Sequence, residues 1–171
     1  MNARLRPPRH LVDPRAIYMW TVSGLAGAVV KILFGVAVAS TVAVARFGWV
    51  PVWVLDNVWW LFAAYATYAL VRAVVIPQWR YRVHRWEVSD DLVYTRTGWL
   101  NMNWQLVPIS RVQTVDHTRT WLERLFGLAT VQIQTASHAG SSEITGLEEQ
   151  LAGQIAEDIA GRAGELRDDA T

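Results

Sequence analysis

The stretch from Val115 to Gly127, VDHTRTWLERLFG, places a carboxylate and an imidazole side by side at Asp116 and His117. An acid that orients a histidine base is a common arrangement in hydrolases. The pattern predicts a strand here, however, and adjacent strand residues point to opposite faces of a sheet. The chain also has no Cys, and it lacks the Gly-x-Ser-x-Gly sequence that would supply an activated serine. We therefore expect a protein that is not an enzyme and has no catalytic residues.

The second part of the same stretch indicates a structural joint. Thr120 and Glu123 have the spacing of a capping box around one helical turn. Gly127 can adopt the left-handed conformation that ends such a turn. Leu122, Leu125 and Phe126 are expected to pack the turn against the rest of the domain. The joint would connect two strands.

The remaining polar residues indicate no metal, cofactor or nucleic-acid site. The four His residues occur singly, without the close spacing of zinc ligands. Glycine-rich phosphate loops are absent, since Gly24 and Gly27 lie within an apolar run where helix packing explains them. The Arg residues form no dense cluster of the kind that binds nucleic acid.

Two long apolar segments, residues 17–45 and 52–76, occupy the first half of the chain. Each exceeds the roughly 20 residues that span a bilayer. The first is too long for the apolar part of a signal peptide, and a second segment follows it at once. Residues 17–77 are therefore predicted to be a transmembrane helical hairpin, with Pro77 ending the second helix. Residues 1–16 would form a basic N-terminal arm.

The flanking charges predict the orientation of this hairpin. Arg residues precede the first segment and follow the second, whereas the short linker has only Arg46. The positive-inside rule then places both termini in the cytoplasm of a bacterial cell, with the hairpin in the plasma membrane. Arg80, Arg82 and Arg85 could contact anionic lipids of the inner leaflet, or they could serve only to fix the topology.

Lys31 lies within the first apolar segment, where an uncompensated charge is costly. It shares a face at four-residue spacing with Gly27, Gly35 and Ala39, which suggests close helix packing. Two interpretations remain open: Lys31 meets a polar partner on another helix or subunit, or it extends toward the headgroups. Asp56 is a poor partner because it lies near the outer end of the hairpin, whereas Lys31 lies nearer the middle.

The second half has short segments with strand periodicity, followed by an amphipathic helix. The predicted strands are residues 79–88, 92–98, 102–109, 111–120, 128–137 and 143–145. Thr145 and Glu148 would form a capping box at the start of the helix. The expected apolar stripe consists of Leu147, Leu151, Ile155 and Ile159. This order predicts an α+β fold, in which residues 78–162 form an antiparallel β-barrel or sandwich capped by the C-terminal helix. Residues 163–171 would be an acidic, disordered tail.

The run ISRVQTVDHTRTWLERLFGLATVQIQTAS, followed by TGL and a helix, resembles the bacterial PH-like domain family of the YdbS-like type. The resemblance covers residues 17–162, and the ERLFGLAT block at 123–130 is its most specific part. It implies two transmembrane helices followed by one PH-like domain on the cytoplasmic face of the membrane. It implies no catalytic residues, and it supplies no agreed ligand.

These observations favour a non-catalytic interaction module that docks or scaffolds a membrane protein partner, or that forms a homo-oligomer. Trp99 and Trp104 are candidate aromatic anchors for such a contact, although core packing is the expected role of at least one of them. The alternative is a module that senses membrane composition by binding anionic headgroups. The loop EVSDDL contains Glu87, Asp90 and Asp91, and these acids would repel an anionic headgroup. Specific recognition of phosphoinositides is therefore not expected.

Overall fold

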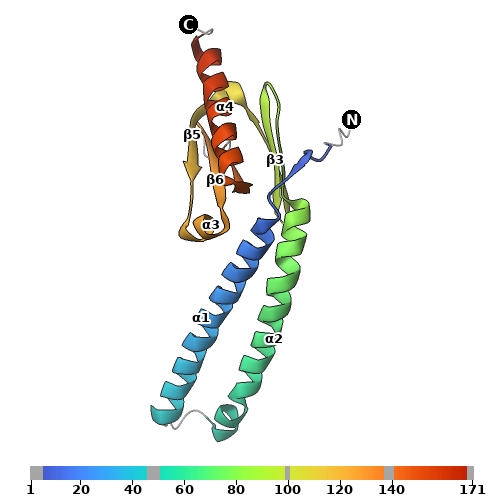
Figure 1. Cartoon of the computed structure of the whole chain (residues 1–171). Helices are drawn as coiled ribbons and strands as arrows, with labels where there is room; N and C mark the ends of the chain where they lie inside the picture. The colour runs from blue at the N-terminus through green and yellow to red at the C-terminus, as the bar shows by residue number, and fades with distance from the viewer. Residues whose placement is uncertain (1–5, 46–50, 99–100, 137–140, 169–171) are drawn as a thin grey trace. The chain divides into compact units, whose positions relative to one another are not determined.

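The computed structural model describes residues 6–45, 51–98, 101–136 and 141–168. The chain divides into two compact units (Figure 1). One unit, the helical hairpin, consists of Trp20–Pro77. The other, the sheet domain, combines the N-terminal residues up to Met19 with the chain from Gln78 onward.

Helices α1 (Arg15–Ala45) and α2 (Val52–Val83) supply the hairpin. They have 31 and 32 residues, and both are long and apolar enough to cross a membrane. Large apolar side chains such as Leu33, Phe34 and Trp60 are mostly exposed on their surfaces. Such surfaces are stable in lipid, where the backbone polar groups are all satisfied within the helix.

Helix α2 does not end at Pro77, as the sequence suggested, but continues to Val83. Residues 79–83, expected at the start of a strand, are therefore helical. The backbone N–H of His84 donates to the Arg80 carbonyl at 2.8 Å and closes the last turn. A proline within a helix removes one hydrogen bond but does not forbid continuation when neighbouring contacts hold the chain. Burial of Pro77 and Val83 provides such contacts.

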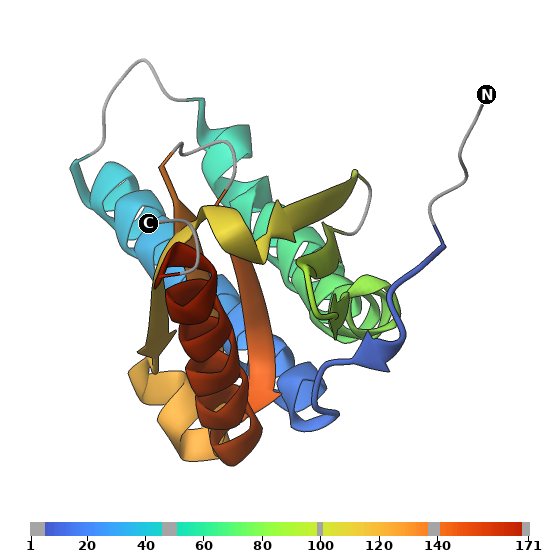
Figure 2. The same ribbon diagram turned by 90° about the horizontal axis from the view of Figure 1, so that it is seen from above.

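The sheet domain contains two antiparallel sheets (Figure 2). The first has the order β1-β2-β3-β4, and its strands are His10–Leu11, Arg85–Val88, Leu92–Gly98 and Met102–Pro108. The second has the order β5-β6-β7, with strands Val112–Thr118, Leu128–Thr135 and Ser142–Glu148. A 3₁₀ turn, Ile109–Arg111, joins the sheets. Because no strand is shared, the domain is a sandwich and not a closed barrel.

Helix α4 (Glu149–Asp168) covers the second sheet, as expected for a capping helix. Its buried side chains are Ala152, Ile155, Ala156, Ile159 and Ala163. They pack over a core in which Leu128, Ile133 and Leu147 are almost completely buried. Leu151 was predicted to belong to this stripe, but it is 37% exposed. The small Ala152 takes the central place instead.

The predicted capping box of Thr145 and Glu148 is wrong, because β7 continues to Glu148. A register shift against β6 occurs at this point, and Gly146 has a φ of 77°. Such bulges let a strand bend where a glycine accepts the left-handed conformation. Helix α4 starts with a backbone bond instead: the N–H of Glu149 donates to the Gly127 carbonyl at 3.2 Å.

Both predicted terminal segments take part in the domain. Helix α4 runs to Asp168 and so includes most of the expected disordered tail, with Ala163 only 2% exposed; residues 169–171 lie outside the described residues. In the N-terminal arm, His10 and Leu11 pair with Trp86 and Arg85 of β2. Residues 10 and 11 of the arm therefore form the edge strand of the first sheet.

Candidate functional site

The predicted joint between two strands is confirmed. Helix α3 (Trp121–Phe126) begins at Thr120, whose hydroxyl accepts from the Glu123 backbone N–H at 3.2 Å. The Glu123 carboxylate accepts from the Thr120 backbone N–H at 2.8 Å. Its other oxygen accepts from the Thr130 hydroxyl at 2.6 Å, and the carboxylate is buried. Gly127 ends the helix with a φ of 66°.

Packing of this short helix differs in part from the prediction. Leu122 and Phe126 are half-buried, whereas Leu125 is 72% exposed. With six residues, α3 makes less than two turns, so it cannot turn all its apolar residues toward the sheet.

Asp116 and His117 lie at consecutive positions of β5, opposite Gln132 and Val131 of β6. The Asp116 carboxylate accepts from the Gln134 side-chain amide at 2.9 Å. This cross-strand bond gives Asp116 an ordinary role in holding the sheet together. Among the residues with described positions, no group of three potential metal ligands comes together.

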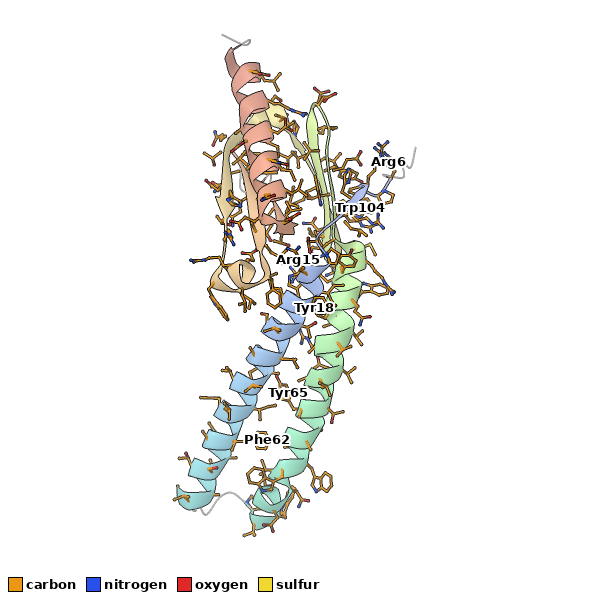
Figure 3. The ribbon with its side chains drawn as sticks, viewed as in Figure 1. Arg6, Arg15, Tyr18, Phe62, Tyr65 and Trp104 are labelled. Carbon is orange, nitrogen blue, oxygen red and sulfur yellow. The ribbon has the colours of Figure 1, made fainter. Side chains whose placement is uncertain are left out.

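A cavity of about 320 Å³ opens within the hairpin. Its lining consists of Lys31, Ile32, Leu61, Phe62 and Tyr65. Figure 3 labels Phe62 and Tyr65 of this lining, both on α2. Lys31 is the single charged residue of this lining and is exposed. It forms no ion pair with any described residue of the chain. The arrangement offers a cation and a phenol on an otherwise apolar surface.

The small residues on the Lys31 face have different surroundings. A Cβ added at Gly35 would lie 2.7 Å from Cε1 of Phe62, so Gly35 allows α2 to approach closely. At Gly27 the added atom would meet nothing within 4 Å. Ala39 is half-buried. Gly35 thus contributes to the packing of α1 against α2, whereas Gly27 and Lys31 remain accessible to another molecule.

The three juxtamembrane arginines do not form one cluster. Arg80 is half-buried, and its Nε donates to Nε2 of His84 at 3.3 Å. Arg82 is exposed near the end of α2. Arg85 belongs to β2, where it pairs with Arg96 of β3. Of the three guanidinium groups, that of Arg82 is the most accessible.

His84 forms a buried link between α2 and β2, and only 4% of its surface is exposed. Its Nδ1 lies 2.9 Å from the Arg80 carbonyl, while Nε2 faces the Arg80 guanidinium. Burial lowers the pKa of His84 to about 4, the nearby charge of Arg80 acts in the same direction, and the hydrogen bond to the carbonyl opposes both. The imidazole is therefore neutral at physiological pH, with Nδ1 donating and Nε2 accepting.

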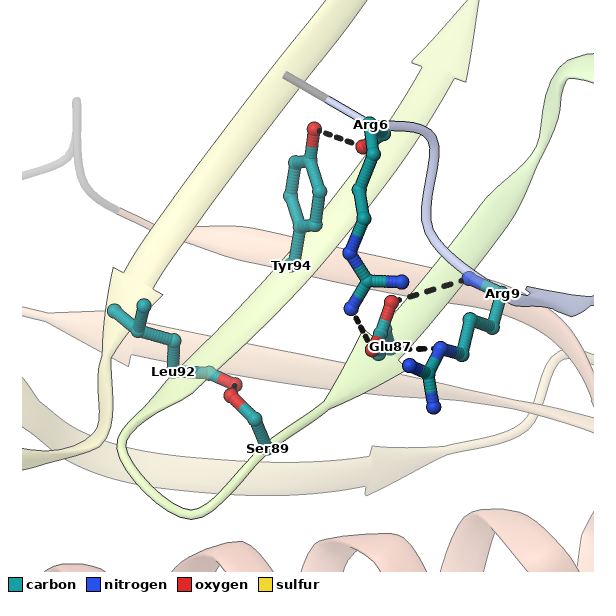
Figure 4. A network of polar contacts seen from close by, with 6 residues as sticks. All are labelled: Arg6, Arg9, Glu87, Ser89, Leu92 and Tyr94. Carbon is teal, nitrogen blue, oxygen red and sulfur yellow. Dashed lines mark hydrogen bonds and ion pairs between the residues drawn. The ribbon is translucent and has the colours of Figure 1, made fainter. Parts of the chain in front are cut away.

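The N-terminal arm is held on the first sheet by a network that sequence reasoning missed (Figure 4). Glu87 accepts from Nη2 of Arg6 at 2.7 Å and from the backbone N–H of Arg9 at 3.2 Å. The Tyr94 hydroxyl donates to the Arg6 carbonyl at 2.9 Å. The indole N–H of Trp86 donates to the Leu11 carbonyl at 3.3 Å. Glu87, which was expected in the acidic loop, therefore lies in β2, and its charge is compensated by Arg6 and Arg9. No local pattern could reveal contacts between residues so distant in sequence.

Trp104, a candidate aromatic anchor, packs within the first sheet. Its ring lies 5.9 Å from that of Tyr94, and the Arg96 guanidinium lies 5.3 Å from the Trp104 ring centroid. The side chain is half-buried. Trp99, the other candidate, lies outside the described residues.

Comparisons with known proteins identify the family. A sequence model described as "Bacterial PH domain" matches residues 22–163. The transmembrane protein YdbS of Bacillus subtilis (strain 168) is 31% identical over 165 residues, which cover 95% of this chain and 96% of that relative. No solved structure matches the chain. Two candidate spans and a transmembrane relative support association with a membrane. The chain therefore belongs to the bacterial PH domain family and is a YdbS-like, membrane-associated member of it.

Proposed function

We propose that this protein is a non-catalytic interaction module of the bacterial plasma membrane. The hairpin holds the module in the bilayer, with both termini and the sheet domain in the cytoplasm, as the flanking arginines favour. Its role is to dock or scaffold a membrane protein, which is a different protein or a second copy of this chain.

The observation that carries this proposal is the position of Lys31. It follows the first residue of α1 by 16 positions (31 − 15) and precedes the last by 14 (45 − 31). At about 1.5 Å per residue, it lies more than 20 Å from either end of the helix. Because about 8 Å of this helix at each end lies outside a hydrocarbon core of about 30 Å, Lys31 lies about 13–16 Å inside the core boundaries. A lysine side chain does not reach that far, so extension toward the headgroups gives little compensation. A charge at the centre of a bilayer costs about 2.5–3.5 kcal/mol on insertion scales.

A partner can supply the missing compensation. The cavity beside Lys31 is open and apolar, and Gly27 leaves space for a helix to approach on the same face. A carboxylate or a backbone carbonyl of another helix, placed in this cavity, would pair with Lys31. Phe62 and Tyr65 would supply the apolar contact around the pair.

Photo-cross-linking in native membranes, followed by mass spectrometry and by native electrophoresis in mild detergent, tests this function. We expect Lys31→Leu to insert normally but to lose the complex, because the polar contact is gone. Lys31→Arg, which keeps the charge, serves as the matched control and should retain most of it. A complex of unchanged size and composition with Lys31→Leu would contradict the proposal.

A lipid-sensing role is the second candidate, and the charge arrangement around Glu87 favours it. Arg6 and Arg9 compensate this carboxylate, so the loop region repels anionic headgroups less than its sequence suggests. Arg82, with Arg80 and Arg85 nearby in sequence, would then contact anionic lipids at about 1 kcal/mol each.

Native mass spectrometry of the whole chain, released from nanodiscs of mixed lipids, separates the two functions. Residues 78–171 alone are unsuitable, because they lack β1. Salt-resistant enrichment of one anionic lipid that Arg82→Gln abolishes would favour sensing. Lipid binding that follows bulk composition would favour docking.

A further inference from the structure

Helix α3 presents an apolar face that none of the described residues of the sheet domain covers. Trp121 is 73% exposed, and Leu125 is 72% exposed. Residues four positions apart lie on the same side of a helix, so the indole and the isobutyl group form one small apolar surface. Isolated exposed aliphatic residues are common, but an exposed Trp beside an exposed Leu on one short helix suggests a contact with an apolar phase.

This surface is held rigidly. The capping box fixes the first turn of α3, and the buried Glu123 carboxylate ties that turn to Thr130 of β6. At the other end, the Gly127 carbonyl accepts from the N–H of Glu149, which starts α4. The two apolar side chains are thus carried on a helix that is fixed at both ends.

Helix α3 lies at the end of the sheet domain where the first membrane helix begins. Arg15–Met19, the first residues of α1, belong to the same compact unit as the sheets. A Cβ added at Gly127 would lie 3.3 Å from Nη1 of Arg15. The backbone N–H of Asp13 donates to the Gly146 carbonyl of β7 at 2.8 Å. Within this unit, Figure 1 shows α3 and the start of α1 at the same end.

The length of α1 indicates where its first residue, Arg15, lies relative to the hydrocarbon core of the bilayer. A helix of 31 residues is about 46 Å long, while the hydrocarbon core is about 30 Å thick. If α1 is centred in the core, Arg15 lies about 8 Å outside it, among the headgroups. Gly127, at the end of α3, lies within side-chain reach of Arg15, so this end of α3 lies at or beside this layer. Trp is enriched there because its ring is apolar and its N–H is polar.

The charges beside the surface fit phospholipid headgroups. Arg124 is exposed on α3, and 55% of the Arg15 side chain is exposed, although its Nε also lies 3.9 Å from the Asp13 carboxylate. Cations next to an apolar surface are typical of segments that lie in a membrane interface. We propose that Trp121 and Leu125 insert into the headgroup layer of the bilayer that α1 spans, so that α3 anchors the sheet domain on the lipid surface. This contact depends neither on a protein partner nor on the pairing of Lys31.

The absence of Cys from the chain makes a direct test possible, because one introduced Cys gives one labelling site. The full-length Leu125→Cys protein is labelled with an environment-sensitive fluorophore and reconstituted in vesicles of zwitterionic and anionic phospholipids. Ala160→Cys provides the control: it is exposed on α4 and lies 11 residues beyond Glu149, about 16 Å along the helix. Trp121→Cys provides a second site on the proposed surface.

Lipid insertion predicts blue-shifted emission at 121 and 125, with quenching by nitroxides attached near the lipid headgroups and little quenching at 160. Equal quenching at 125 and 160 would overturn the proposal. Blue-shifted emission without lipid quenching would overturn it too, because the surface would then be covered by protein. Both sites are mostly exposed, so the substitutions should leave the fold intact, which circular dichroism can verify.

Discussion

The same apolar residue types have opposite surroundings in the two units. In the sheet domain, Leu128 and Leu147 have exposed fractions of 0% and 1%. In the hairpin, Leu33 and Leu61 are exposed by 64% and 69%. The sheet domain buries its own core away from water, whereas the hairpin leaves its surface to the lipid and to whatever binds there. The difference shows that the sheet domain has a closed apolar core of its own, whereas the hairpin keeps its apolar side chains on its surface.

Charged residues within the two units show the same difference. Glu123 is buried, and three donors from Thr120 and Thr130 satisfy it. Lys31 has no ion pair within the described part of the chain. A polar group that is fully paired internally contributes to stability, while one that is left open in an apolar environment needs compensation, which the proposed partner would supply.

Replacement of leucines gives the largest expected effect and tests the comparison directly. Leu147→Ala should destabilise the sheet domain by about 2–5 kcal/mol, because it leaves a cavity in a closed core. Leu33→Ala, the matched change in the hairpin, should leave the same quantity unchanged. Hydrogen exchange of the β6 amides measures the free energy of opening in both variants. Equal effects would mean that the two units share one folding equilibrium.

The pH dependence of stability should show the contribution of His84. Its pKa in the folded protein is about 4, against an ordinary value of 6.5 in the unfolded chain. Between these values the unfolded state binds a proton that the folded state does not, so stability falls as the pH drops from about 6.5 to about 4, by up to about 3 kcal/mol. Hydrogen exchange of β2 and β3 at several pH values measures this loss. In His84→Gln, the same pH range should have much less effect.

Loss of the Glu123 carboxylate should have a somewhat smaller effect. Glu123→Ala should cost about 1–3 kcal/mol, because it removes the cap and leaves the Thr130 hydroxyl buried without its acceptor. Glu123→Gln keeps an acceptor for the Thr120 N–H and should cost less. Thermal unfolding of the purified protein compares the two variants. If Glu123→Ala and Glu123→Gln lowered the stability equally, the negative charge of Glu123 and not its capping hydrogen bond would be the stabilising feature.

A glycine pair in the hairpin should give the smallest effect. In Gly35→Ala the new methyl group meets Phe62, which must move and thereby change the cavity beside Lys31. Gly27→Ala places the same group in open space. We expect Gly35→Ala to change the packing of the hairpin and to weaken co-purification of a partner slightly. Gly27→Ala should leave the packing of the hairpin unchanged in the absence of a partner. Cysteine cross-linking between the helices measures that packing.

Sequence patterns predicted most of the sheet domain correctly, because its signals are local. Strands β3 to β6 follow from alternation, and the joint at Thr120–Gly127 follows from capping chemistry. The start of α4 was placed too early because a Thr and a Glu three positions apart resemble a cap, although a bulged strand occupies those residues.

The features that sequence could not predict depend on distant residues. Strand β1 has only two residues and no sequence pattern of its own. It forms because its backbone pairs with the edge of β2. The residues after Pro77 alternate like a strand, yet those up to Val83 are helical. Burial of Val83 and His84 accompanies this helical end. For the candidate site, sequence singled out Lys31 but could not indicate the cavity next to it or the exposed face of α3.

The pairing of His10 with Trp86 has a consequence for biogenesis. These residues are 76 positions apart (86 − 10), and both membrane spans lie between them. During synthesis the N-terminal strand emerges first, but its partner appears only after the second span has left the ribosome. The two strands can therefore pair, and the first sheet can be completed, only after both spans have been synthesised. A paired β1 therefore means that both spans have already been synthesised. The positions of His10 and Trp86 on either side of the hairpin set this order of assembly.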